Sequence, residues 1–329
     1  MVKIGVLGAG GMGNVHTRHY KAMPDVEVSI FDIREDAKAD FAGRHQVKPA
    51  SSLQELIDWA DAIDVCLPTD LHKPHALMAI AAGKSVLCEK PMGIDEQECI
   101  EMMEAASKAG VLLMPAQVVR CFPEFKHAHD LVVARKVGTP IAARTRRGGK
   151  APVGSGSWFT DTNRSGGVLL DLAIHDFDWL RWTFGEVASV SSRTVRITRP
   201  EMLAGLPGDY SLTTLEFDSG LIAHVEGTWL DPSGFRATFE VCGTDGMIEF
   251  DSRKVGVSRV HTEGKSITEN PMDQARDPYY VQGRGFVEAI VNKTAPPVTA
   301  LDGLMAVSIA RAAMQSAATG KPVSPSRHF

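Results

Sequence analysis

The amino-terminal segment constrains the fold of this chain most. An apolar, β-branched run over residues 2–8 leads directly into G-A-G-G-M-G, which places Gly8, Gly10 and Gly13 in the spacing G-x-G-x-x-G. In this spacing one glycine permits a tight turn, the next lets the backbone approach a phosphate, and the third lets a helix pack against a strand. A strand, a glycine-rich turn and a helix amino terminus in this order predict a dinucleotide-binding βα unit.

Short β-rich runs and helical stretches alternate over the first third of the chain. We expect further strands at 26–32, 62–68, 85–91 and 110–117, and helices at 12–23, 34–45, 52–60, 72–82 and 95–109. This alternation is typical of parallel strands joined by crossover helices. Because the runs are almost continuously apolar, we expect helices on both faces, as in a doubly wound α/β sheet.

The pattern changes after Cys121, and the length suits two domains, which we place at 1–121 and 122–329. We expect helices at 123–135, 167–184, 279–292 and 301–318, strands at 210–217, 221–229 and 235–242, and a mobile glycine-rich loop within 148–167. The D-S-G at 218–220 and the D-P-S-G at 231–234 are typical of hairpin connections. The second domain is therefore expected to be an open, mostly antiparallel sheet with helices on one face.

Charge and cysteine usage exclude several classes of protein. Lys and Arg total 35 against 40 Asp and Glu, so no overall positive field attracts nucleic acid or an anionic membrane. The five cysteines are scattered without Cys-x-x-Cys pairs, which argues against a disulfide framework or a zinc site. The amino terminus enters a strand directly, and no apolar run approaches the roughly 20 residues of a membrane span. These features predict a cytoplasmic protein without nucleic-acid or membrane partners.

Asp32 and Arg34 bear on the choice of cofactor. Asp32 ends the second expected strand, about 20 residues beyond Gly13, where a carboxylate accepts hydrogen bonds from the adenosine ribose and repels a 2′-phosphate. This position favours NAD. Arg34 is either a solvated residue in a first helical turn or a partner for a 2′-phosphate, so NADP stays possible.

Lys90 stands in C-E-K-P at the carboxyl end of an expected buried strand, the edge where ligands of parallel sheets bind. An ammonium group there can polarise a carbonyl or assist proton transfer. A lone lysine is otherwise a solvated surface residue.

Asp171 and His175 are four residues apart within an expected helix, so both side chains can reach one cleft. An imidazole exchanges protons near neutral pH, and a carboxylate one turn away orients it. Two alternatives are a metal site that adds Asp178 and a helix that carries these residues on its solvated face. Trp158 in the glycine-rich segment either covers a sugar face or anchors the loop.

The ordered set G-x-G-x-x-G, E-K-P and G-G-x-x-x-D-x-x-x-H resembles the Gfo/Idh/MocA family of sugar and cyclitol oxidoreductases over essentially the whole chain. The resemblance implies a Rossmann domain followed by an α+β domain with an open sheet. It also implies oxidation of a ring secondary alcohol, with Lys90 as catalytic lysine, Asp171 as orienting acid and His175 as general acid/base. The segment at 174–178 is similar to inositol dehydrogenases, whereas 120–125 and 158–167 resemble other sugar dehydrogenases.

The resemblance further implies two sets of binding residues. The cofactor set is Gly8, Gly10, Gly11, Met12, Gly13, Asp32, Arg34, Leu67, Pro68, Thr69, His72, Glu89 and Lys90. The substrate set is Lys90, Gln117, Trp158, Asp171 and His175, with no metal. Alternatives within the family are a keto- or anhydro-sugar reductase and a nucleotide-sugar 3-dehydrogenase, and an alternative of another class is a non-catalytic sugar-sensing regulator.

The open sheet also predicts self-association. Strands that are apolar on both faces, with helices for only one, leave an apolar face that an oligomer normally buries. We therefore expect a homodimer or homotetramer formed through the carboxyl-terminal sheet.

Overall fold

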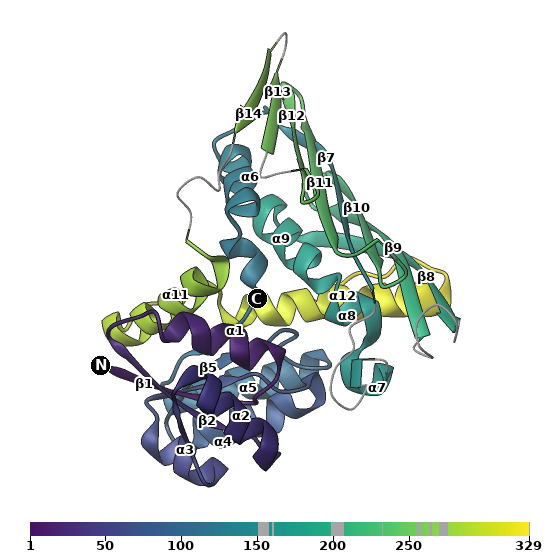
Figure 1. Cartoon of the computed structure of the whole chain (residues 1–329). Helices are drawn as coiled ribbons and strands as arrows, with labels where there is room; N and C mark the ends of the chain where they lie inside the picture. Colours follow the sequence, from purple (N-terminus) through teal and green to yellow (C-terminus); the bar gives the residue numbers. More distant parts are fainter. Residues whose placement is uncertain are drawn as a thin grey trace. The chain divides into compact units, whose positions relative to one another are not determined.

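The computed structural model divides into two compact units, Met1–Val118 with Arg276–Leu304 (unit 1) and Val119–Ala275 with Met305–Phe329 (unit 2) (Figure 1). It describes residues 1–150, 158–159, 161–198, 207–231, 233–254, 258–262, 265–269 and 276–328. The first division falls within a few residues of the expected boundary at 121. The expected second domain, 122–329, did not allow for the return of the chain to unit 1 at Arg276.

Unit 1 contains a six-stranded parallel sheet in the order β3-β2-β1-β4-β5-β6. The strands are β1 (Val2–Leu7), β2 (Val26–Phe31), β3 (Lys48–Pro49), β4 (Ala62–Val65), β5 (Ser85–Cys88) and β6 (Leu113–Pro115). The order reverses between β1 and β4, which creates the crevice where doubly wound sheets bind ligands. The predicted Rossmann fold is confirmed, and the short β3 is an additional strand.

The helices of unit 1 begin and end close to the expected positions. They are α1 (Gly11–Tyr20), α2 (Glu35–His45), α3 (Leu53–Trp59), α4 (His72–Ala81), α5 (Glu96–Ala109) and α11 (Pro278–Asn292), with a 3-10 turn, η1 (Thr69–Leu71). Tyr20 and Met23 join Phe286 and Val287 in one buried cluster, so α11 packs on α1. A Cβ at Gly283 would lie only 3.0 Å from the Tyr20 ring, which shows how closely the two helices approach.

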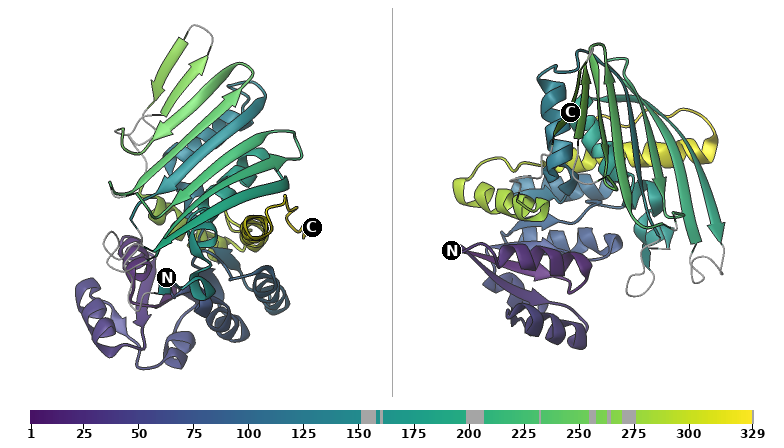
Figure 2. Two further views of the ribbon diagram at one scale, coloured as in Figure 1. Left: turned by 90° about the vertical axis from the view of Figure 1, so that its right-hand side faces the viewer. Right: turned by 45° about the horizontal axis from the view of Figure 1, so that its top comes forward.

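Unit 2 contains an eight-stranded sheet in the order β14-β13-β12-β11-β7-β10-β9-β8 (Figure 2). The strands are β7 (Pro140–Gly148), β8 (Val187–Thr198), β9 (Pro207–Phe217), β10 (Ile222–Thr228), β11 (Arg236–Gly243), β12 (Gly246–Asp251), β13 (Ser258–Thr262) and β14 (Lys265–Glu269). All neighbouring pairs are antiparallel except β7 with β10. The predicted mostly antiparallel sheet is confirmed.

The two expected hairpins of this sheet have different outcomes. Residues 218–220 do join β9 to β10, which pair directly. The hairpin expected at 231–234 is wrong, because β7 lies between β10 and β11 and pairs with both. The strand that separates them comes from much earlier in the chain, so local turn chemistry carries no signal for it.

Helices cover one face of the unit 2 sheet. They are α6 (Pro123–Val133), α7 (Thr162–Ser165), α8 (Gly167–Asp171), α9 (Ile174–Phe184) and, from Met305 onward, α12 (Ala300–Thr319). Phe125 of α6 and Trp179 of α9 pack edge to face at 5.3 Å, and Phe239 of the sheet lies 5.0 Å from the Phe125 ring. The indole N–H of Trp179 donates to the Phe125 carbonyl at 3.0 Å, so this aromatic core is also satisfied in hydrogen bonding.

The single helix expected over 167–184 is wrong, because the structure divides it into α8 and α9. The Val168 carbonyl accepts from the N–H groups of both Leu172 and Ala173, at 3.1 and 2.9 Å, which closes the first helix after Asp171. The second helix then begins at Ile174. Uninterrupted apolar residues across the break explain why helical periodicity alone did not locate it.

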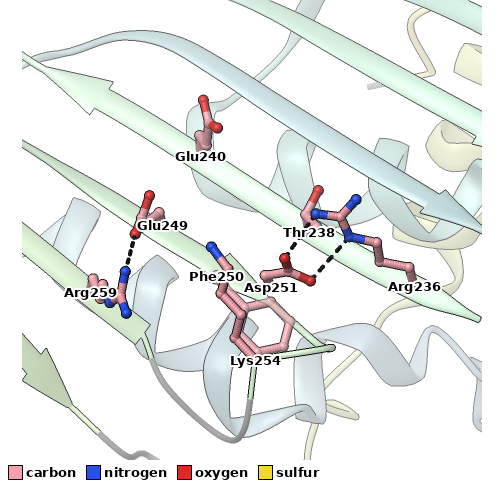
Figure 3. Close-up of a pocket in the computed structure, with 8 residues that line it drawn as sticks. All are labelled: Arg236, Thr238, Glu240, Glu249, Phe250, Asp251, Lys254 and Arg259. Carbon is pink, nitrogen blue, oxygen red and sulfur yellow. Dashed lines mark hydrogen bonds and ion pairs between the residues drawn. The ribbon is translucent and has the colours of Figure 1, made fainter.

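The face of the sheet turned away from the helices is mixed rather than uniformly apolar as expected. Charged side chains lie on it over β7 and β11–β13, while Val195, Leu212 and Ile222 are exposed on β8–β10. Ion pairs join Arg144 to Glu240, and Arg236 to Asp251, at 2.8 Å each. Figure 3 shows a pocket on this face that is lined mainly by such side chains. The lining residues are Arg236, Thr238, Glu240, Glu249, Phe250, Asp251, Lys254 and Arg259. Buried residues alternate with exposed ones along strands such as β10 and β11. Oligomerisation stays a prediction.

Two further expectations concern the glycine-rich loop and the absence of a membrane span. Part of the glycine-rich loop expected within 148–167, at 151–157 and at 160, lies outside the described residues. Within the part of the chain that the structure describes, no helix is both long enough and apolar enough to cross a membrane.

Candidate cofactor and substrate site

The glycine turn after β1 has the geometry that its spacing predicts. Gly8 adopts φ +112°, and a Cβ there would lie 2.5 Å from the Cys66 carbonyl oxygen. A Cβ at Gly13 would lie 2.0 Å from the Gly8 carbonyl oxygen, so α1 can approach the turn only with glycine at this position. Around Gly10, in contrast, no described atom outside its own neighbours lies within 4 Å of a Cβ position. This open side of the turn is where a phosphate can approach the backbone.

The amino terminus of α1 is suited to an anion. Gly10 is its N-cap and supplies no side-chain cap, and the first turn, which includes Gly11 and Met12, carries no acidic residue. The first backbone N–H groups of a helix have no partner within the helix, and the helix dipole adds partial positive charge there. A pyrophosphate fits this cradle.

Asp32 and Arg34 form a pair at the end of β2. Asp32 is buried and accepts from the Ala9 N–H at 2.8 Å and from the Arg34 N–H at 2.9 Å. The Arg34 guanidinium also contacts both carboxylate oxygens, at 3.1 and 3.2 Å. Burial opposes ionisation, yet the hydrogen bonds from Arg34 and Ala9 hold the pKa of Asp32 below its ordinary value. The Asp32 carboxylate is charged and binds the Arg34 guanidinium, so this guanidinium is engaged and a 2′-phosphate would be repelled. This arrangement favours a cofactor with an unphosphorylated ribose.

The segment after β4 lies along the same carboxyl edge. His72 is buried and its ring spans two backbone carbonyls, with Nδ1 2.7 Å from the Pro91 oxygen and Nε2 2.9 Å from the Leu67 oxygen. This ring therefore ties the end of β4 to the segment after β5. Thr69 follows Pro68, is fully buried, and its hydroxyl has no hydrogen-bond partner among the described residues.

The segment after β5 carries Glu89 and Lys90, followed by Pro91 in a cis peptide. The Lys90 backbone N–H donates to Glu89 Oε2 at 3.0 Å. After β6, the strand that pairs with β5, Gln117 is fully buried and neither atom of its side-chain amide has a partner in the described chain. Buried amides are normally satisfied, so Gln117 is a candidate for contact with a ligand.

A buried group in unit 1 was missed by the sequence analysis. His16 of α1 lies with Nδ1 2.8 Å from Asp64 Oδ2, and Cys66 Sγ lies 3.3 Å from Asp64 Oδ1. All three side chains are buried, and their polar atoms lie within 4.8 Å of one another. The one available sequence signal was Asp64, a lone acid within an otherwise apolar strand.

In unit 2, Asp171 is buried at the end of α8 and His175 is half-buried in the first turn of α9. Because the helix is interrupted between them, their four-residue spacing alone no longer places the two side chains on one helical face, and their joint role stays a prediction. Trp158 stacks on Phe159 at 3.8 Å, which is compatible with either role expected for it.

Two buried arginines hold α9 beside His175. Arg147 donates to both oxygens of Asp176, and Arg120 donates to Asp178 through Nε at 2.8 Å and through a second nitrogen. Because Asp178 is occupied by Arg120, the metal alternative that required its carboxylate loses a ligand.

The carboxyl edge of unit 1 thus gathers the glycine turn, Asp32, Thr69, Lys90 and Gln117 on one sheet. This fold and this edge define a dinucleotide-binding protein of the Rossmann class.

Comparison with known proteins identifies the family. Residues 2–117 match the family described as "Oxidoreductase family, NAD-binding Rossmann fold", and residues 125–249 match the "GFO/IDH/MocA C-terminal domain". The chain belongs to the Gfo/Idh/MocA family of NAD-binding oxidoreductases.

Full-length relatives support this assignment. "Uncharacterized oxidoreductase YrbE" of Bacillus subtilis is 31% identical over 330 residues, which cover 97% of this chain and 95% of the relative. "Myo-inositol 2-dehydrogenase" of Thermotoga maritima is 29% identical over 325 residues, 96% of each chain. The crystal structure of GenD2 from gentamicin A biosynthesis, in complex with NAD, superposes with a TM-score of 0.84 at 28% identity and covers 99% of this chain and 97% of GenD2. The chain is therefore an oxidoreductase with an NAD-binding domain.

Proposed function

We propose that the protein interconverts a ring secondary alcohol of a sugar or cyclitol and the corresponding ketone, with NAD as the redox partner. The placement of Lys90 carries the proposal, because this lysine follows β5 at the carboxyl edge of the sheet. Gln117 follows the neighbouring strand β6, and its buried amide has no partner among the described residues. The similarity to a myo-inositol 2-dehydrogenase supports the substrate class.

In this proposal two residues act on the oxygen of the reacting hydroxyl group. His175 removes the hydroxyl proton, and the Lys90 ammonium stabilises the negative charge that develops on that oxygen. Asp171 orients the His175 imidazole and favours its protonated form. Gln117 and Trp158 contact the substrate. Bound NAD supplies a hydride acceptor, and the protein's contribution is placement and charge.

The cofactor residues take distinct roles in the proposal. The turn from Gly8 to Gly13 and the first N–H groups of α1 hold the pyrophosphate. Asp32 accepts from the ribose hydroxyls, while Arg34 keeps this carboxylate charged. His72 acts indirectly, because its ring braces Leu67 against Pro91, and Pro68 and Thr69 then line the same edge. Glu89 holds the Lys90 backbone.

The proposal is tested with Lys90→Met. NADH formation is followed by absorbance with a panel of inositols, hexoses and anhydro-sugars, and NADH binding is followed by fluorescence. We expect Lys90→Met to lose about a hundredfold or more of kcat while it still binds NADH, because oxygen stabilisation of this kind contributes at least that much. Lys84→Met is the matched control, since Lys84 lies just before the same strand and its ammonium donates to the Ala60 carbonyl.

Two results would contradict the proposal. Unchanged turnover in Lys90→Met would remove this lysine from the chemistry. NADH binding without turnover of any polyol or keto-sugar, in either direction, would replace the enzyme with a sensing function.

We also infer a cytoplasmic homodimer or homotetramer. The oligomer inference rests on the exposed face of the unit 2 sheet, which carries the apolar Val195, Leu212 and Ile222. The same face carries Arg and carboxylate side chains that can pair across a symmetric interface. A monomeric mass at micromolar concentration in light scattering would contradict it.

A further inference from the structure

A row of polar contacts runs from the core of unit 1 to Lys90. Asp64 Oδ2 contacts His16 Nδ1 at 2.8 Å, and the opposite ring nitrogen, Nε2, lies 3.3 Å from Glu89 Oε1. The second oxygen of Glu89 accepts from the Lys90 backbone N–H at 3.0 Å. Three elements, α1, β4 and the segment after β5, thus meet through one imidazole.

The charges of this row explain why the residue between the two acids is a histidine. Asp64, His16 and Glu89 are all buried, and two buried carboxylates without a cation between them would repel each other. Burial opposes a charged imidazole, but Asp64 and then Cys66 outweigh it, so the pKa of His16 lies well above its ordinary value. A protonated ring can donate from both nitrogens, one toward each acid.

The surroundings of the ring contain few other ionisable groups. Cys66 Sγ lies 3.5 Å from Nδ1, and Tyr20 and Tyr279 place their rings 6.5 and 6.1 Å from the imidazole. His19 lies one turn further along α1 and contacts Asp277 at 3.2 Å. Tyr279 and Asp277 come from α11 and its N-cap, so the late return of the chain to unit 1 brings these two residues beside His16 and His19.

The contact between His16 Nε2 and Glu89 is an ion pair without hydrogen-bond geometry. His16 Nε2 is buried and satisfies no hydrogen-bond geometry among the described residues, although Glu89 Oε1 is within ion-pair distance. A carboxylate held mainly by charge, directly before Lys90, keeps some freedom to adjust when a ligand occupies the edge of the sheet.

We propose that His16 is a positioning residue, whose imidazolium, anchored by Asp64, holds the Glu89 carboxylate and through it the backbone of Lys90. The reaction described above enters this inference only in its turnover measurement. The charge on His16 and the affinity for NADH are measured without any substrate.

The first measurement is the ring ¹⁵N NMR spectrum of the histidines, with the His16 signals assigned from His16→Gln. In the unmodified protein we expect a doubly protonated His16 ring at pH 7, and in Asp64→Asn a neutral one. A neutral His16 ring at pH 7 in the unmodified protein would overturn the proposal, whatever Asp64→Asn shows.

The second measurement distinguishes a positioning role of His16 from a contribution to the stability of the fold. We expect His16→Gln to weaken NADH binding on the order of tenfold and to lower kcat by up to about a hundredfold, with a smaller change in KM for the polyol. His19→Gln, on the same helix with its own carboxylate, is the control and should change each value less than about twofold. A lower midpoint of thermal unfolding with unchanged NADH affinity and kcat would make His16 merely structural.

The third measurement tests whether His16 acts through Glu89. If it does, adding His16→Gln to Glu89→Gln should produce little further loss of NADH affinity, because the carboxylate that His16 holds is already absent. Independent, additive losses in the two variants would overturn the proposal. If no polyol is turned over, the reaction proposed above fails, while the NMR and NADH measurements still decide the role of His16.

Discussion

The guanidinium of Arg147 donates to both carboxylate oxygens of Asp176, from Nε to Oδ2 at 2.7 Å and from Nη2 to Oδ1 at 3.2 Å. Both side chains are buried, and the same guanidinium lies over the Phe125 ring at 5.5 Å. Arg147 belongs to β7 and Asp176 to the first turn of α9, immediately after His175. The ion pair thus fixes the start of α9 against the sheet.

The first prediction concerns this pair. Asp176→Asn leaves the buried Arg147 charge without its counter-ion, and the loss of one partner of a buried pair typically costs about 3–5 kcal/mol of unfolding free energy. Denaturant unfolding followed by circular dichroism measures the change. Arg144→Met, at an exposed pair with Glu240 on the same strand, is the control, for which we expect about 1 kcal/mol or less. Equal effects at the two positions would show that burial does not decide the difference.

The second prediction concerns cofactor choice. Asp32→Ser removes the carboxylate that occupies Arg34 and that repels a 2′-phosphate, so the guanidinium becomes available to a phosphate. We expect the ratio of affinities for NADPH over NADH to rise by about tenfold or more, because a charge-assisted hydrogen bond contributes roughly 1.5–3 kcal/mol. The double variant Asp32→Ser/Arg34→Gln should lose most of that gain. If it keeps the gain, the guanidinium is not the phosphate partner.

Local sequence signals were sufficient for most of unit 1. Each of these signals, namely the glycine spacing, the buried strand runs and Asp32, depends only on a few adjacent residues. Parallel strands then bring their carboxyl ends to one edge of the sheet by topology alone. For the same reason Lys90 could be assigned to this edge from its strand alone, whereas Gln117 was expected only through the family resemblance.

Features that depend on distant segments were not predictable from local patterns. The insertion of β7 between β10 and β11 joins strands that are far apart in the sequence, and the packing of α11 on α1 joins the amino-terminal part of the chain to a segment late in the sequence. His16 was missed because its partners, Asp64 and Glu89, lie on two other elements. The residues around a histidine in a helix do not indicate which distant side chains it will contact.

The third prediction concerns pH and stability. The pKa of His16 is raised in the folded state, so its contribution to stability is fully present below the unfolded value of about 6.5 and is lost as pH rises through the folded pKa. Mainly through burial, the pKa of His19 is lowered, which reverses the sign: folding is penalised as pH falls below about 6.5. Unfolding free energies measured by urea titration across pH 5–9 should therefore lose an alkaline decline in His16→Gln and an acidic decline in His19→Gln. The same profile in both variants would contradict the assignment.

The fourth prediction separates a glycine needed for folding from one needed for the cofactor. Gly13→Ala places a methyl group 2.0 Å from the Gly8 carbonyl oxygen, so we expect both lower thermal stability and weaker NADH binding. Gly10→Ala meets no described atom within 4 Å outside its own neighbours, so thermal stability should change little. The added methyl group would nevertheless occupy the open side of the turn, where the pyrophosphate is proposed to approach, and NADH affinity should fall by about tenfold or more. Fluorescence titration with NADH and thermal unfolding of the same preparations measure both quantities. If Gly10→Ala binds NADH as the unmodified protein does, the pyrophosphate does not contact this side of the turn.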